Sequence, residues 1–202
     1  INKKVRYSDS WILKPKNLIK KVPQNKILIY YKKEHYNKGY RKHYMFFPKK
    51  IILNEKFLSA LGFFDAEGSK TKYKSVEVVN SEPSLIRLFI SFLDYFKIKT
   101  ENLNYRIIFN NKLPYLLKMS KKEISNNAIE FWSNQVKIPI NKEIKISYVG
   151  RSTGKSRANI IKYGSLNIHY NSVLFRKFLF NLIKTVKDKK MSKEESMAYL
   201  RG

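Results

Sequence analysis

One stretch of the chain has the clearest pattern in the sequence: Phe57-Leu-Ser-Ala-Leu-Gly-Phe-Phe-Asp-Ala-Glu-Gly-Ser-Lys70. Its apolar residues predict a helix. Ser59, Gly62 and Ala66 are spaced i, i+3 and i+7, so they share one side of that helix. Because this side has no bulky groups, a second helix can approach it closely. We therefore expect a helix–helix seam along these three small residues.

The end of the same helix carries two carboxylates, Asp65 and Glu67, followed by Gly68. The C-terminus of a helix is the negative end of its dipole, where a carboxylate is disfavoured by roughly 0.3–1 kcal/mol. Such a placement makes sense if a cation binds there. Gly68 is expected to supply the backbone freedom to leave the helix, and Asn54 stands where it can cap the helix start.

Residues 60–68 resemble the nine-residue motif of the LAGLIDADG homing endonucleases. Gly62 and the run Asp65-Ala-Glu-Gly68 match the motif, whereas Ala60 and Leu61 depart from its usual Leu-Ala order. The segments that follow have the family's order: an alternating strand over 70–80, an amphipathic helix over 84–96 and a strand over 105–109. Residues 66–70 look like archaeal members in particular. The alternative is an ordinary core helix with an acidic end.

The resemblance implies an α+β fold, the LAGLIDADG homing endonuclease fold, in which a curved antiparallel β-sheet forms a saddle with packed helices. The saddle strands are expected at 70–80, 103–110, 142–149 and 158–169, the last as the return strand of a hairpin. In the helix over 84–96 we expect a buried face made of Leu85, Leu88, Phe89, Phe92 and Phe96. Further helices are expected at 113–119, 126–135 and 171–186.

Three regions are expected along the chain. Residues 1–50 form a basic N-terminal arm and a β-hairpin, with strands at 25–31 and 40–47 joined by a turn at Tyr36-Asn-Lys-Gly39. Residues 51–190 form the LAGLIDADG endonuclease domain. Residues 191–202 begin a capped helix. It is either the opening of a truncated second motif, with Tyr199-Leu-Arg-Gly202 in the place held by residues 58–62, or a polar terminal helix.

The activity implied by the resemblance is site-specific cutting of both strands of DNA, as in intron homing by intron-encoded enzymes. The motif carboxylates would hold Mg²⁺ for phosphodiester hydrolysis. The catalytic residues carried over are Glu67, Lys70 and Asn80. Glu67 is the expected metal ligand, joined by the Ala66 carbonyl; Lys70 would face the scissile phosphate and Asn80 would orient water.

The charge of the chain agrees with a nucleic-acid partner. Forty-two Lys and Arg against 15 Asp and Glu give a net charge of +27, which favours binding to a polyanion. The excess lies outside the motif region, since residues 51–100 carry seven basic and six acidic side chains. The expected DNA contacts on the saddle and its loops are Lys72, Lys74, Glu77, Arg106, Lys145, Arg151, Lys155, Arg157 and Lys162.

One motif provides one metal-binding carboxylate, but cutting both strands requires two. The expected partner besides double-stranded DNA is therefore a second copy in a homodimer, or a second LAGLIDADG half that is not in this chain. A non-cutting nucleic-acid binder on the same scaffold, such as an intron-splicing maturase or a regulator, is the alternative function. A ribosome-associated basic protein would explain the charge but not the motif.

Composition limits the remaining classes. The chain has no cysteine, so disulfides and cysteine zinc clusters are excluded. It has neither an apolar run of 18 residues nor a signal peptide, so no membrane partner is expected. We expect an intracellular, non-secreted protein. Its abundance of Ile, Lys, Asn, Tyr and Phe suggests an AT-rich prokaryote (cytoplasm or nucleoid) or an organelle.

Overall fold

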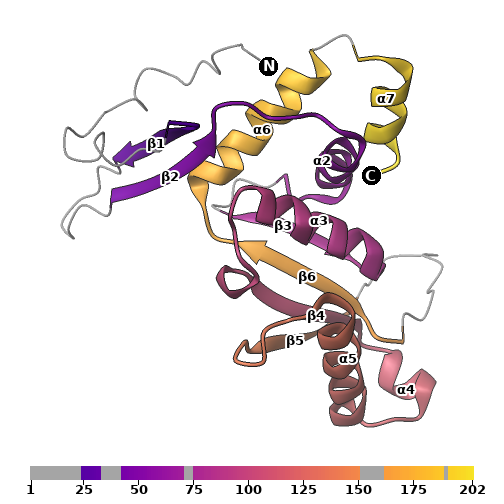
Figure 1. The fold of residues 1–202 in the computed structure, drawn as a ribbon. Coiled ribbons are helices and arrows are strands. Elements are labelled where there is room, and N and C mark those ends of the chain that lie inside the picture. Colours follow the sequence, from indigo (N-terminus) through magenta and orange to yellow (C-terminus); the bar gives the residue numbers. More distant parts are fainter. Residues whose placement is uncertain (1–23, 33–41, 71–74, 151–161, 189–190) are drawn as a thin grey trace.

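A computed structural model describes residues 24–32, 42–70, 75–150, 162–188 and 191–202. These residues form a mixed α+β structure (Figure 1). In chain order the elements are β1 (Lys26–Lys32), β2 (Lys42–Pro48), α2 (Glu55–Glu67), β3 (Val76–Asn80), α3 (Pro83–Tyr95), the 3₁₀ turn η2 (Thr100–Asn102), β4 (Asn104–Asn110), α4 (Leu113–Leu117), α5 (Lys121–Val136), β5 (Ile144–Val149), β6 (Ser165–Tyr170), α6 (Val173–Lys187) and α7 (Lys193–Leu200).

The predicted N-terminal hairpin is confirmed. β1 and β2 pair antiparallel, with Lys26 opposite Pro48, and the expected turn at 36–39 lies outside the described residues. Phe47 of β2 is fully buried, and its ring centroid lies 4.3 Å from that of Phe178 in α6. The hairpin is therefore anchored to the core through α6, beside which it lies in Figure 1.

The four strands expected for the saddle do form one sheet, in the order β3-β6-β4-β5. Two details of the prediction were wrong. β6 does not pair with β5 as a return strand, because β4 lies between them. β4 and β5 run parallel, so the sheet is mixed and not wholly antiparallel. Residues 111–143, which contain α4 and α5, provide the long crossover that a parallel pair requires.

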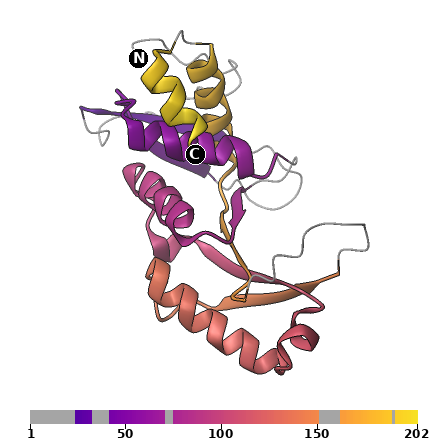
Figure 2. The same cartoon turned by 90° about the vertical axis from the view of Figure 1, so that its right-hand side faces the viewer.

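Helices α3 and α5 lie on the same side of this sheet (Figure 2). The strands alternate accordingly: in β4, Tyr105, Ile107 and Phe109 are buried, whereas Asn104, Arg106 and Asn110 are exposed. Trp132 of α5 is fully buried, and its Nε1 donates a hydrogen bond of 2.9 Å to the Tyr163 carbonyl before β6. One face of the sheet thus belongs to the core, and the other is polar.

Helix α3 occupies the predicted place, and three of the five residues expected on its buried face are buried: Phe89, Phe92 and Phe96. Ile86, Phe89, Phe92 and Leu93 are buried within the helix, while Leu85 and Leu88 are only half-buried. Ile86 and Leu93 are buried in place of Leu85 and Leu88 because α3 contacts α2, α5 and β3 at once. α5 begins at Lys121, five residues before the prediction, because Ser120 and Glu123 form a capping box.

Within the described parts of the chain, no helix is both long and apolar enough to cross a membrane.

Candidate functional site

Helix α2 is the central element of the site. The predicted cap is confirmed: Asn54 Oδ1 accepts a hydrogen bond of 2.8 Å from the Phe57 backbone N–H. Every residue from Ala60 to Phe64 is buried. Ring contacts fix the helix further, since Phe64 stacks on Phe89 of α3 at 5.8 Å between centroids. The middle of α2 is therefore buried and fixed by its neighbours, and its last turn lies at the surface.

The small residues of α2 face the chain's own C-terminal helix. Ser59 Oγ donates a hydrogen bond of 2.8 Å to the Ala198 carbonyl of α7. Gly62 lies against the Tyr199 backbone so closely that a Cβ would overlap the Tyr199 carbonyl oxygen. Ala66, the third member of the expected seam, is exposed. Two of the three seam residues are thus covered by α7, and the third is open.

The α2–α7 contact is reciprocal. A Cβ on Gly202 would overlap the Ser59 carbonyl oxygen, as a Cβ on Gly62 would overlap that of Tyr199. Residues 199 and 202 follow residues 59 and 62 by 140 positions. Each glycine therefore packs on the residue that corresponds to the other glycine's partner, which is the pattern of a two-fold interface. Residues 199–202 therefore stand to α2 as residues 59–62 stand to α7. A second copy pairing through Ser59 and Gly62 would have to displace α7.

Asp65 ties three helices together. Its Oδ2 accepts a hydrogen bond of 2.9 Å from the Tyr199 hydroxyl of α7 and forms an ion pair of 2.5 Å with Lys187 Nζ of α6. Partial burial alone would raise the pKa of the Asp65 carboxyl, but these hydrogen bonds and the charges of Lys187 and Lys70 outweigh it, so that the pKa is lowered. Asp65 is a structural brace, ionised under ordinary conditions.

Glu67 and Ala66 form the exposed last turn of α2. The chain then leaves the helix along an edge of the sheet: Gly68 forms a bridge with Val78, and the Ser69 N–H donates to the Glu77 carbonyl at 2.9 Å. The explanation expected for Gly68 was wrong. Its φ is −68°, which any residue adopts, and the glycine is needed because a Cβ would overlap the Phe64 carbonyl oxygen and ring.

The oxygen atoms at this turn provide part of a ligand set for a hard cation. The last carbonyls of a helix have no partner within it, so the Ala66 carbonyl and the Glu67 carboxylate offer oxygen ligands of the kind that Mg²⁺ prefers. Among the residues that the structure describes, no three His, Asp or Glu side chains gather into a metal-binding group. This turn therefore supplies two protein oxygens, and a bound Mg²⁺ would complete its shell with waters, phosphate or another carboxylate.

The two other expected catalytic residues lie at the same end of α2. Lys70 is exposed, and its charge contributes to the lowered pKa of Asp65. Asn80 lies on β3, two residues beyond Val78, the bridge partner of Gly68. Its Oδ1 accepts a hydrogen bond of 2.8 Å from the Glu82 N–H at the turn into α3. That oxygen is therefore engaged, and the amide NH₂ remains as the group able to contact water.

The predicted DNA-contact residues divide into two groups. Arg106 and Lys145 are exposed and lie directly opposite each other in the β4–β5 register. Lys162 is exposed, with Nζ 5.2 Å from the centre of the Tyr163 ring. Glu77 is half-buried, and its Oε1 accepts a hydrogen bond of 2.6 Å from Asn167 Nδ2. Five candidates lie outside the described residues: Lys72, Lys74, Arg151, Lys155 and Arg157.

Asn167 and His169 of β6 were missed by the sequence reasoning. Asn167 is only 4 % exposed, and His169 faces Glu77 in the β3–β6 register. Burial lowers the pKa of His169, and the charges of Arg106 and Lys145 lower it further, against the opposing charge of Glu77. The alternation of residues 165–170 is a signal that could have placed both side chains on the polar face.

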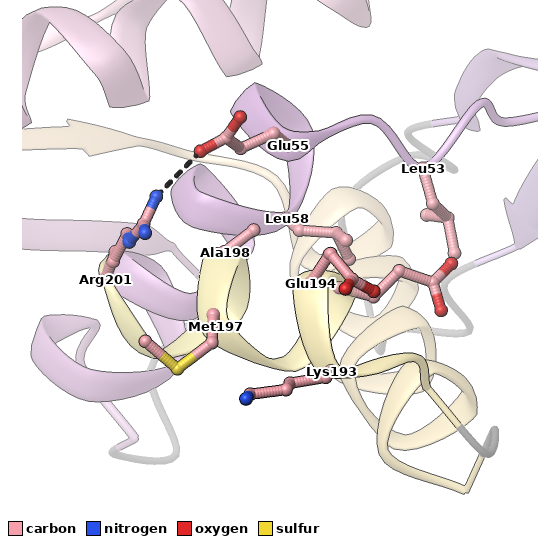
Figure 3. A pocket seen from close by; sticks show the side chains of 9 residues that line it. Leu53, Glu55, Leu58, Lys193, Glu194, Met197, Ala198 and Arg201 are labelled. Atoms are coloured by element: carbon pink, nitrogen blue, oxygen red, sulfur yellow. Dashed lines mark hydrogen bonds and ion pairs between the residues drawn. The ribbon is translucent and has the colours of Figure 1, made fainter.

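A pocket lies at the opposite end of α2, between its first turn and α7 (Figure 3). Leu58 and Ala198 line it, and Arg201 forms an ion pair of 3.0 Å with Glu55 at its edge. Residue 55 is twelve residues from Glu67, or about 18 Å along a helix. The pocket is therefore separate from the carboxylate end of α2.

The comparisons with known proteins give no match: no family model fits the sequence, and neither a curated protein nor a solved structure is significantly similar to it.

Proposed function

We propose that this protein is a Mg²⁺-dependent endonuclease of the LAGLIDADG type that cuts both strands of DNA at a specific site. The observation that carries the proposal is the position of Glu67. Its carboxylate is exposed at the end of an otherwise buried helix, at the edge of the sheet whose polar face presents Arg106 and Lys145. The family's known target class, intron-insertion sites, is the first substrate to test.

Hydrolysis of a phosphodiester needs neutralised charge, an activated water and a stabilised leaving oxygen, which divalent ions supply when bound. In this chain, the Glu67 carboxylate and the Ala66 carbonyl would hold the ion. The Lys70 ammonium neutralises the scissile phosphate from the same end of α2. Because Asn80 Oδ1 is engaged by the Glu82 N–H, Asn80 orients water or phosphate through its amide NH₂.

The duplex lies along the polar face of the sheet. Arg106 of β4 and Lys145 of β5 lie opposite each other on adjacent strands. Like charges placed directly opposite destabilise a sheet. A phosphate placed between them removes this repulsion. Contacts of this kind provide affinity and salt dependence, whereas contacts to base edges provide specificity.

Cutting both strands calls for a second carboxylate. Since α7 already covers Ser59 and Gly62, a homodimer through these residues requires a rearrangement, and the contact favours pairing of α2 with a motif that α7 begins. Such a second LAGLIDADG motif would supply the second carboxylate beside Glu67. Two like charges this close favour a bound cation.

A non-cutting nucleic-acid binder, such as a maturase or regulator, is the second candidate. One observation favours it: within the described residues, a single carboxylate stands at this end of α2 without a structural partner, because Asp65 is engaged by Lys187 and Tyr199. Such a binder keeps the polar face and does not need Glu67.

A cleavage assay separates the two. The protein is incubated with a plasmid library of intron-insertion sites, with and without Mg²⁺. The endonuclease gives linear plasmid only with Mg²⁺, and Glu67→Gln abolishes cutting while binding survives. Glu130→Gln, which removes the same charge from an exposed position on α5, is the matched control and cuts normally. Binding without cutting by the wild type at every Mg²⁺ concentration supports the second candidate instead.

A further inference from the structure

Among the strands that the structure describes, the polar face of the main sheet carries one negative side chain. The residues that face this side by alternation are Glu77, Val79, Asn104, Arg106, Ile108, Asn110, Lys145, Ser147, Val149, Ser165, Asn167 and His169. In the strands that the structure describes, Glu77 is the only acidic residue. A carboxylate on a face that meets phosphates is repelled, so its presence calls for a specific partner.

Glu77 is also held in place. Asn167 Nδ2 donates to Glu77 Oε1 at 2.6 Å from a position that is 4 % exposed. The buried Asn167 Oδ1 has no hydrogen-bond partner within the described part of the chain. An unsatisfied buried oxygen destabilises a fold, and the opposite amide orientation would turn this oxygen toward the carboxylate. The Asn167 amide is therefore oriented by Glu77, and it fixes Oε1 while leaving Oε2 available.

We propose that Glu77 is a specificity-determining residue that accepts a hydrogen bond from the N4 amino group of a cytosine in the DNA major groove, with Asn167 as its positioning residue. This inference rests on the proposed function. A carboxylate accepts from cytosine N4, a donor that no other base presents at that place. Phosphates offer only acceptors, so a fixed carboxylate on this face suits a base edge and is unsuited to the backbone.

The hydrogen bond from Asn167 to Glu77 explains why one carboxylate suffices to discriminate between bases. Glutamate loses side-chain entropy when it is ordered; Asn167 has already ordered Glu77 in the free protein. Arg106 and Lys145, whose side chains lie on the same face, hold the neighbouring phosphates. Glu77 then selects the base, and the two cations contribute affinity.

The test compares base preferences. Wild type, Glu77→Gln and Asn167→Ala each select duplexes from one random-sequence library, with Ca²⁺ in place of Mg²⁺ to limit cutting. The bound sequences are read by deep sequencing. Wild type is expected to require cytosine at one position by about tenfold. In Glu77→Gln, the amide oxygen still accepts from Asn167, and its NH₂ replaces Oε2. That donor fits thymine O4, which lies where cytosine N4 lies, so the preference changes from cytosine to thymine at that position alone.

Asn167→Ala is expected to reduce the cytosine preference severalfold while leaving the other positions unchanged, a result that lost stability alone would not give. Glu130→Gln is the matched control for charge and keeps the wild-type preference. If Glu77→Gln keeps the wild-type preference at every position, as Glu130→Gln is expected to, then Glu77 is a local counter-ion and the inference is overturned. If the wild type selects no duplex at all, the proposed function itself fails. Circular dichroism establishes that each variant is folded.

Discussion

At the scale of single residues, the two acids of the motif have different environments. Asp65 has two partners and a lowered pKa, whereas Glu67 is exposed at the last turn of α2. Their spacing and their place at a helix end were readable from the sequence. The partners of Asp65 were not, because Lys187 and Tyr199 are more than a hundred residues away and only tertiary packing brings them there.

The Asp65 contacts give a stability prediction. Asp65→Ala is expected to lower the free energy of unfolding by about 2 kcal/mol, since two hydrogen bonds to a charged, partly buried carboxylate are lost. The pKa of Asp65 is lowered from 3.8, so this contribution is present above pH 4 and is lost as the pH falls below it. Urea unfolding of both proteins at pH 7 and pH 3 measures the difference.

Asp94→Ala is the control for Asp65→Ala. Asp94 forms an ion pair of 3.0 Å with Lys99, but both side chains are more than half exposed, so its loss should change stability by less than about 1 kcal/mol. Equal losses for the two variants would contradict the bracing role of Asp65.

His169 gives a second prediction at this scale. Because burial lowers its pKa below 6.5, the unfolded chain binds a proton more readily, and folding stability falls as the pH drops through this range. The charged groups that act on its pKa are Glu77, Arg106 and Lys145. His169→Gln is expected to flatten the pH dependence of the unfolding free energy between about pH 7 and 5. An unchanged slope in urea titrations would show that His169 does not cause it.

At the scale of elements, periodicity predicted most helices and all four strands of the main sheet. It failed on pairing. Residues 143–149 alternate as any strand does, but alternation does not show which strand lies next to them. In the structure, β6 pairs with β3 and β4 and not with β5. Periodicity predicted the buried face of α3 only in part, because α3 contacts three other elements and buries Ile86 and Leu93 as well.

The α2–α7 seam can be tested at Gly62. In an exposed helix Gly→Ala stabilises by up to about 1 kcal/mol. Here a Cβ would overlap the Tyr199 carbonyl, so Gly62→Ala is expected to destabilise by roughly 1–3 kcal/mol. Ala66→Gln, on the exposed end of the same helix, should change stability by less than about 0.5 kcal/mol. Thermal unfolding measures both, and a stabilising Gly62→Ala would mean that α7 does not pack on α2.

At the scale of the whole molecule, net charge was readable from composition and its placement was not. A charge of +27 predicts a polyanionic partner, but only the β4–β5 register brings Arg106 and Lys145 opposite each other. The same holds for α7, whose sequence left two alternatives open and whose contact with Ser59 and Gly62 comes from the fold.

Salt dependence tests the polar face. If Arg106 contacts a phosphate, Arg106→Gln reduces the slope of log K against log salt by about 0.9. Lys122→Gln, at an exposed position on α5 on the other side of the sheet, should leave the slope unchanged. Fluorescence anisotropy with a labelled duplex measures the slope over a range of about 50 to about 300 mM salt. Equal effects of the two variants would point to diffuse charge in place of a defined face.

The most direct measurement is the location of the bound ion. Mn²⁺ takes oxygen ligands like those of Mg²⁺ and broadens nearby amide signals in NMR spectra. With a bound duplex, Mn²⁺ is expected to broaden the amide signals of residues 66–70 in the wild type, and Glu67→Gln should abolish this broadening. Broadening that persists unchanged in Glu67→Gln, or that centres on another part of the molecule, would contradict a divalent-ion site at the end of α2.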